Sequence, residues 1–281
     1  MKLSNSQISI LKFALFRYQM GLTLDVDFAS KYWSKADIAE LKTYKQFSKF
    51  FSHNGKSNPI VSEKVSKAIA ASKRFLFKDW VRFISVTGSV AAGNPRETDD
   101  IDMFIVVKDY RSWIYRLILK LKANDLRRYG DTNFQNTFCV NFICEERALL
   151  FEQQNIFTLH EMLRMIPIYN EDFYKEILGA NQWIERFHIP APRLNTEIKS
   201  TEGIIKKAFY RLTNFFAFAS QLSYMLLSRH KADVSRLIHG YQKGDIRFYP
   251  KDFNQEKLNN VKLLYREFLP ASATTATEAT T

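Results

Sequence analysis

The first quarter of the chain has apolar positions at a helical spacing. In the first stretch they recur every three to four residues: Ile8, Leu11, Leu15 and Phe16. Residues 30–50 and 62–78 carry further periodic stretches, and a polar cluster at 51–59 between them is typical of a turn. This pattern fits a winged-helix-like region with the cluster as its wing, and it fits a plain helical bundle equally well.

The pattern changes between residues 80 and 145. Short runs of β-branched and aromatic residues predict strands at 81–87, 101–107 and 137–144, and the periodic stretch at 110–128 predicts a helix. Strands and helices of these lengths indicate a compact unit that contains both. We therefore expect an α+β fold with a small mixed β-sheet, flanked by helical regions on both sides.

Helical periodicity returns after residue 145. It predicts helices at 158–165, 171–187, 204–229, 234–240 and 256–268. Prolines within residues 189–192 interrupt the pattern and mark a linker. The expected organisation is a helical N-terminal region (1–78), a core with the sheet (79–190), a C-terminal helical region (191–270) and a low-complexity tail (271–281) whose composition predicts disorder.

Composition narrows the class of protein. The chain has 41 Lys and Arg against 29 Asp and Glu, a formal net charge of +12 that favours polyanionic partners such as nucleic acid or nucleotides. No window reaches the roughly 18 consecutive apolar residues of a membrane span, and the start shows no signal peptide. Cys139 and Cys144 form neither a disulfide framework nor a zinc pattern. We expect a cytoplasmic protein that does not interact with membranes.

The chemistry concentrates in residues 86–107. A Gly88-Ser89 turn follows the first predicted strand, and Asp100 and Asp102 lead into the second. Residues two apart on a strand face the same side, so these two carboxylates project together and require a proton or a cation between them. Oxygen ligands favour Mg²⁺ bound together with substrate phosphates. Glycine permits close approach of a phosphate to the backbone, and the Ser89 hydroxyl is a donor for it. Asp99 is expected to face away from the other two aspartates, as a turn or strand-entry residue.

This combination of Gly-Ser, ten intervening residues and Asp-hydrophobic-Asp before an apolar strand resembles the DNA polymerase β-like nucleotidyltransferase superfamily. Further segments are similar to uncharacterised prokaryotic nucleotidyltransferase-domain proteins, among them Trp113–Arg116, Phe138–Phe142, Phe157–Leu163, Ile166–Tyr169 and Ala180–Trp183. The resemblance spans roughly residues 8–190. It implies a polymerase β-like palm that transfers a nucleoside monophosphate from an NTP to an acceptor, with Asp100 and Asp102 as catalytic ligands of Mg²⁺ or Mn²⁺ and with Gly88 and Ser89 on the NTP phosphates.

One part of the superfamily pattern is missing. The third carboxylate is usually on a later strand, where this chain has Asn141. Asn141 is either a metal ligand through its carbonyl oxygen or a hydrogen-bonded core amide. Glu145, Glu146 and Asp131 are substitutes near the same strand, although none has the mid-strand position.

Two functions follow. The first is an active nucleotidyltransferase with an unidentified acceptor, and the positive net charge slightly favours nucleic acid. The second is a catalytically degenerate fold that binds nucleotides or nucleic acid. Arg116, Lys120 and Arg127 on the predicted 110–128 helix form either a basic face for nucleic acid or a solvated helix face. His160 and Glu161 lack a second histidine four residues on, which argues against a zinc helix.

Overall fold

The computed structural model describes residues 3–53, 58–122, 125–127, 134–193, 202–227, 233–247 and 253–269, without the side chains of residues 141, 253 and 254. The predicted disordered tail at 271–281 and Asp131 lie outside these residues. Within them, none of the helices combines the length and the apolar character needed to cross a bilayer.

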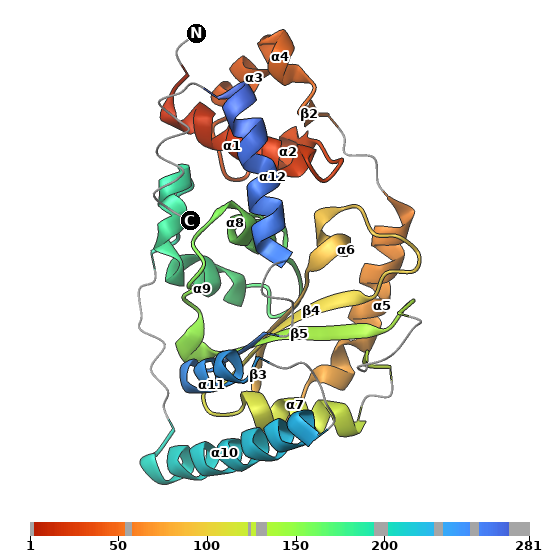
Figure 1. The fold of residues 1–281 in the computed structure, drawn as a ribbon, viewed down its shortest axis with the longest axis vertical. Coiled ribbons are helices and arrows are strands. Elements are labelled where there is room, and N and C mark those ends of the chain that lie inside the picture. Colours follow the sequence, from red (N-terminus) through yellow and green to blue (C-terminus); the bar gives the residue numbers. More distant parts are fainter. Residues whose placement is uncertain are drawn as a thin grey trace.

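A mixed five-stranded sheet lies at the centre of the described part of the chain (Figure 1). Its strands, in spatial order, are β6 (Ile166–Tyr169), β3 (Val81–Val86), β4 (Ile101–Val107), β5 (Phe138–Glu145) and β7 (Asp245–Arg247). β4 and β5 are parallel, whereas the other neighbours are antiparallel. This sheet with its surrounding helices confirms the predicted α+β class. β3, β4 and β5 match the three predicted strands, but β6 and β7 were not predicted.

The two faces of the sheet carry separate cores. On β4, Ile101, Met103 and Ile105 belong to the core shared with α5 (Pro59–Phe75), α7 (Ser112–Lys122), α10 (Ile204–Leu227) and α11 (Val234–Lys243). Phe104 and Val106 belong to the opposite core, which includes α1 (Asn5–Tyr18), α8 (Ile156–Arg164), α9 (Phe173–Ala180) and α12 (Phe253–Phe268). We call these sides the α7 face and the α8 face. Since side chains alternate along a strand, Asp102 is on the α8 face with Phe104.

The N-terminal helices begin with clear capping signals. Ser4 and Gln7 form a capping box at the start of α1, and Asn58 caps α5 just before Pro59. The predicted stretch 30–50 forms α3 (Lys35–Thr43) and α4 (Lys45–Ser48), because Tyr44 between them is extended with φ −78° and ψ 114°.

The turn cluster predicted at 51–59 contributes only a short strand to the described structure. β2 (Phe51–Ser52) pairs in parallel with β1 (Leu24–Asp25), which is followed by α2 (Val26–Ala29). Residues 54–57 lie outside the described part of the chain. The winged-helix reading and the domain boundaries therefore stay predictions.

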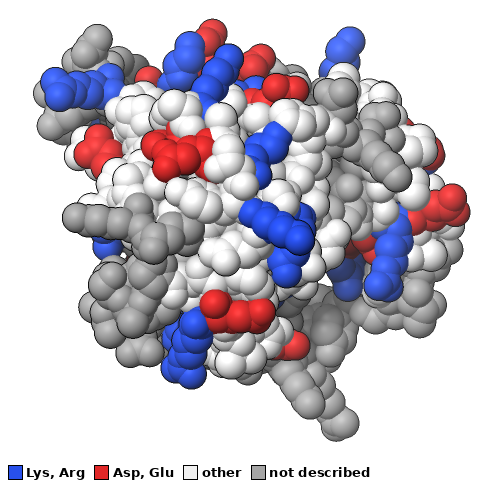
Figure 2. Space-filling model, turned by 90° about the horizontal axis from the view of Figure 1, so that it is seen from above, with Lys and Arg blue, Asp and Glu red and all other residues white. Residues whose placement is uncertain are grey.

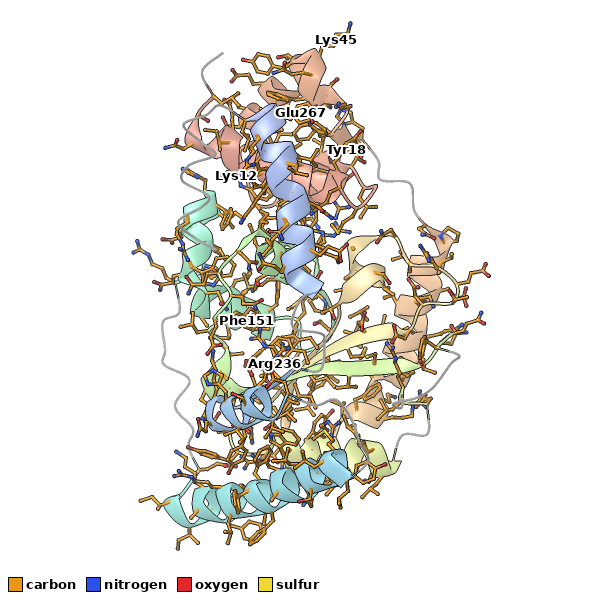
Figure 3. The ribbon with its side chains drawn as sticks, in the orientation of Figure 1. Lys12, Tyr18, Lys45, Phe151, Arg236 and Glu267 are labelled. Carbon is orange, nitrogen blue, oxygen red and sulfur yellow. The ribbon has the colours of Figure 1, made fainter. Side chains whose placement is uncertain are left out.

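The last helix returns to the first one. α12 packs on α1 and α8 at the top of Figure 1, and the side chains that fill this contact are drawn in Figure 3, where Lys12 and Tyr18 lie beside α12. Leu258, Val261 and Tyr265 are buried there. The C-terminal region thus contributes both an edge strand and a helix to the structure around the core.

Two predicted helices are shorter than their periodicity indicates. α7 ends at Lys122, and Asp125–Arg127 pair with the start of β5 instead: Phe138 donates to Asp125 O at 2.9 Å, and Arg127 donates to Phe138 O at 2.9 Å. The predicted 171–187 helix divides at Asn181 into α9 and the 3-10 helix η2 (Gln182–Phe187). A second 3-10 helix, η1 (Glu146–Ala148), follows β5.

Candidate active site

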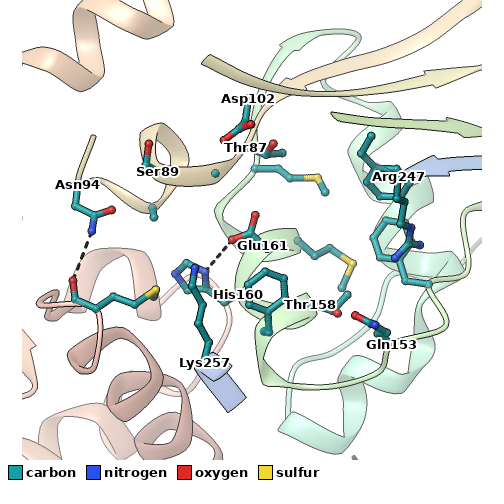
Figure 4. Close-up of a pocket in the computed structure, with 18 of the residues that line it drawn as sticks. Thr87, Ser89, Asn94, Asp102, Gln153, Thr158, His160, Glu161, Arg247 and Lys257 are labelled. Carbon is teal, nitrogen blue, oxygen red and sulfur yellow. Dashed lines mark hydrogen bonds and ion pairs between the residues drawn. The ribbon is translucent and has the colours of Figure 1, made fainter. Parts of the chain in front are cut away.

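A pocket of about 540 Å³ opens on the α8 face, at the start of β4. Its lining includes Gly88, Ser89, Asp100 and Asp102, so the structure brings together the residues that the sequence singled out. Figure 4 shows Ser89 and Asp102 on one side of this pocket and Glu161 on the other. The volume is within the range of pockets that hold small ligands.

The two aspartates lie close together at the pocket wall. One oxygen of Asp100, one oxygen of Asp102 and the Cys139 sulfur all lie within 4.8 Å of one another. Burial raises the pKa of the Cys139 thiol, so it remains protonated at neutral pH and is a poor ligand for hard cations. The carboxylate oxygens are therefore the donors that suit Mg²⁺ or Mn²⁺.

Asp102 has a strongly perturbed carboxyl group. Burial, followed by the negative charges of Asp100 and Glu161, raises the pKa of Asp102 from 3.8 to about 7. A carboxylate in such surroundings favours a bound proton or cation. Perturbed groups of this kind are frequent at functional sites.

Arg127 neutralises the other aspartate. Its Nη1 donates to Asp100 Oδ2 at 2.7 Å, and the Asp100 side chain is 14% exposed. The sequence placed Arg127 on a basic helix face, whereas it follows the end of α7 and reaches the pocket. A protein cation thus occupies one side of the aspartate pair.

The backbone conformation at position 88 and the neighbouring Asp102 side chain both require a glycine there. It has φ +63°, and a Cβ at this position would lie 2.1 Å from Asp102 Oδ2 and 2.9 Å from its Cγ. A side chain here is excluded both by the left-handed backbone and by the carboxylate. The glycine predicted for phosphate approach therefore also makes room for Asp102.

Ser89 and Asp99 fasten the loop that carries the aspartates. The Ser89 hydroxyl donates to Asp99 Oδ2 at 3.0 Å, and the Arg96 N–H donates to the same oxygen at 2.9 Å. From α5, the nearly fully buried Lys64 donates to Asp99 O at 2.6 Å and to Glu97 O at 3.1 Å. Asp99 is thus a turn residue as predicted, and in this structure it holds the Ser89 hydroxyl that the sequence assigned to phosphate.

Glu161 is a further acid in the pocket, and sequence reasoning missed it as a site residue. It comes from α8, which Asn155 caps by accepting from the Thr158 N–H at 3.0 Å. Burial acts to raise the pKa of Glu161, but His160, Lys257 and a hydrogen bond from the Gly88 N–H together lower it. Glu161 is therefore an ionised carboxylate opposite Asp102. No local spacing could reveal it, because its position depends on packing of α8 against α6 (Gly88–Ala92).

His160 connects this acid to a buried arginine. Arg17 Nη1 lies 3.1 Å from His160 Nε2. Because a guanidinium only donates, Nε2 accepts and the imidazole proton is on Nδ1, which lies 3.5 Å from a Glu161 oxygen. Arg17 also donates to Ala92 O at 3.2 Å and to Thr23 O at 3.0 Å. The N-terminal helix α1 thus supports both α6 and the orientation of His160.

Among the substitutes proposed for a third acid, Glu145 and Glu146 are described, and neither lines the pocket. The Glu145 side chain is fully buried and accepts from the Ser112 hydroxyl at 2.7 Å and from Arg147 Nε at 2.9 Å. Glu146 pairs with Arg82 at 2.7 Å. Asn141 is in β5, but its side chain lies outside the described residues. Within the described lining, the acids are Asp100, Asp102 and Glu161.

The predicted basic helix face is only partly solvated, because Lys120 and Arg127 are exposed whereas Arg116 is partly buried. Arg116 donates to Gln221 of α10, and burial lowers the pKa of Arg116 to about 10. Burial and the nearby Arg116 lower the pKa of Lys120 to about 8. In the view of Figure 2, basic and acidic side chains are interspersed on the surface. The net positive charge is therefore not gathered into one patch on that described surface.

Asn181, which follows α9, has a structural role. It is fully buried and donates to Leu149 O at 2.8 Å and to Ile177 O at 2.7 Å. Its Oδ1 accepts from the Phe151 N–H and from Trp183 Nε1, both at 2.9 Å. Asn181 thus fixes the segment that carries Phe151 to the pocket wall.

Comparison with known proteins adds no relative. The chain matches no protein-family model, and comparison with curated proteins and with solved structures also gives no match.

Proposed function

We propose that this protein is a nucleotidyltransferase that uses Mg²⁺ or Mn²⁺ to transfer a nucleoside monophosphate from an NTP to an acceptor. The observation that carries the proposal is the Asp100–Asp102 pair at a pocket of about 540 Å³, with Gly88 directly against Asp102. The palm-like fold of the nucleotidyltransferases is part of this proposal. A mixed sheet with the paired acids at the start of a central strand supports it.

The residues present suit a divalent cation. Two oxygen donors lie within 4.8 Å of each other. The pKa of Asp102 is raised first by burial and then by the like charges of Asp100 and Glu161, which a cation would offset. When bound, such cations stabilise the attacking and leaving oxygens of an in-line displacement. Asp100 and Asp102 would hold them, and no step of proton transfer needs to be assigned to either aspartate.

In this proposal the other pocket residues position the substrate phosphates and support the two aspartates. The Gly88 turn leaves space beside Asp102, and Ser89 exchanges its bond to Asp99 for one to a phosphate oxygen. Glu161 faces the same space and is the candidate for the third carboxylate, because none of the described side chains of β5 brings one to the pocket. Because little covalent chemistry is assigned to the protein, loss of either aspartate should remove most of the activity.

The acceptor that we favour is nucleic acid, and the support for it is the formal net charge of +12. The alternative function is a degenerate fold that binds nucleotides without transfer. The Arg127–Asp100 ion pair at 2.7 Å favours this alternative, since an arginine already neutralises one of the two acids.

A labelling experiment tests the proposal. Purified protein is incubated with each α-labelled NTP, with Mg²⁺ or Mn²⁺, and with total RNA, protein or small-molecule acceptors. Label transfer should occur with the wild type and with Asp172→Ala, whose side chain is 93% exposed, but not with Asp100→Ala. NTP binding without transfer to any acceptor under either metal would favour the degenerate fold and reject the enzyme.

A further inference from the structure

Helix α12 carries a lysine into the pocket from the far end of the chain. Val261 and Tyr265 of this helix are 1% and 3% exposed, and the Tyr265 hydroxyl donates to Lys12 O at 3.2 Å on α1. Packing therefore fixes the position of α12 beside α8 (Figure 1). Lys257, one turn before Val261, lines the pocket.

The Lys257 side chain has both an apolar support and acidic neighbours. Its ammonium nitrogen lies 5.4 Å from the centre of the Phe157 ring, a distance at which a cation and an aromatic face attract each other. The charges of Glu161 and Asp102 act on Lys257, and they oppose the lowering of its pKa by burial. Figure 4 shows Lys257 rising from α12 toward Glu161.

The two arginines of the pocket are held by nearby acids. Arg127 pairs with Asp100 at 2.7 Å. Arg247 pairs with Asp245 at 3.0 Å, and its guanidinium lies 4.4 Å from the centre of the Phe142 ring. Lys257 differs from them because its ammonium is a compact charge with three donors on a flexible stem, which suits phosphate oxygens.

We propose that Lys257 binds the phosphate groups of a nucleoside triphosphate, so that α12 forms the wall of the active site opposite Asp100 and Asp102. This inference rests on the proposed function and adds to it a contact from outside the region that resembles nucleotidyltransferases. The bound phosphates lie between the aspartates, which hold cations, and the ammonium of Lys257. Charge-assisted hydrogen bonds of this kind are among the stronger ones in proteins.

Two probes separate the phosphate contact from recognition of the base. Calorimetry measures the binding of Mg²⁺–ATP and of Mg²⁺–tripolyphosphate to the full chain. Lys257→Met keeps the contact with Phe157 and should weaken both probes about 10- to 100-fold, as expected for a lost bond to a charged group. Lys257→Arg should retain most of the affinity. Lys262→Met on the same helix, which does not line the pocket, is the matched control and should bind both probes as the wild type does.

The possible results distinguish a failure of this inference from a failure of the proposed function on which it rests. Unchanged binding of both probes by Lys257→Met would overturn the inference, and so would an equal loss in Lys262→Met. If label transfer by the wild type is abolished in Asp100→Ala but unchanged in Lys257→Met, the proposed function stands and the inference fails. If the wild type neither binds tripolyphosphate nor transfers label, both fail. Thermal unfolding of each variant establishes that it is folded, and Lys257→Gln replaces Lys257→Met if that variant is not.

Discussion

Replacing Asp102 with asparagine should stabilise the metal-free protein at alkaline pH. The pKa of Asp102 is raised, so its carboxylate is harder to form in the folded state than in the unfolded one. The resulting destabilisation of the folded state is absent below pH 3.8, grows as pH rises, and is complete above about pH 7. Asparagine has nearly the same shape and no charge, and it removes the penalty.

The magnitude follows from the two pKa values. The pKa changes from 3.8 to about 7, and each pKa unit corresponds to about 1.4 kcal/mol, so the penalty is about 4 kcal/mol above pH 7. At pH 5.5 about half of it is present. The gain from Asp102→Asn should therefore be about 2 kcal/mol larger at pH 8 than at pH 5.5.

The assay is urea unfolding of both proteins at pH 5.5 and at pH 8, with EDTA and with Mg²⁺. With EDTA at pH 8 the variant should be the more stable protein. Adding Mg²⁺ should stabilise the wild type by mass action and leave the variant unchanged. Asp172→Asn, whose side chain is 93% exposed, should have no effect at either pH. A difference between wild type and Asp102→Asn that is the same at both pH values would refute the reasoning, because burial and like charge would then not act on this carboxylate.

Three further substitutions test residues that shape or support the pocket. Gly88→Ala places a Cβ 2.1 Å from Asp102 Oδ2 and should abolish Mn²⁺ binding in calorimetry. The control is Gly21→Ala, at a position with φ +74° and open space around it. This control should lose only about 1 kcal/mol of stability to backbone strain and should bind Mn²⁺ normally. Arg127→Gln removes the cation at Asp100, so Mn²⁺ should bind about threefold more tightly, as expected for a partly exposed ion pair; weaker binding would contradict this. Asn181→Ala leaves the buried groups that hydrogen-bond to Asn181 without their partner, so it should lower the free energy of unfolding by about 3 kcal/mol. A loss below 1 kcal/mol would show that these hydrogen bonds contribute little.

The central strands and the motif between them were predictable because their signals are local. Val81–Val86 and Ile101–Val107 carry dense β-branched runs, and the two-residue spacing of Asp100 and Asp102 fixes their common face. β6 and β7 are only four and three residues long, and β6 contains Pro167. Their strand character comes from pairing with β3 and β5 across long sequence separations, which no local pattern encodes.

The opposite wall of the site was not predictable from spacing. Glu161 was considered only as a zinc-motif partner, and its role depends on α8 lying beside α6. The position of Lys257 at the pocket depends on the packing of α12 against α1 and α8, and Lys257 comes more than 150 residues after the Gly88 turn along the chain. Arg127 was assigned to a helix because the apolar period of α7 continues past Lys122, but backbone pairing with Phe138 takes over there.

The charges of the pocket limit what it can bind. Its described lining contains the acids Asp100, Asp102 and Glu161 and the Arg and Lys side chains Arg127, Arg247 and Lys257. A bare cation would satisfy the acids while displacing Arg127 from Asp100, and a bare anion would satisfy Lys257 while leaving Asp102 beside two like charges. A complex of a divalent cation with a polyphosphate brings both signs at once, so each displaced side chain gains a new partner. Under the proposed function we therefore expect a metal–nucleotide complex to bind more tightly than either component alone. Mg²⁺ and tripolyphosphate should then bind cooperatively, each increasing the affinity for the other by the same factor.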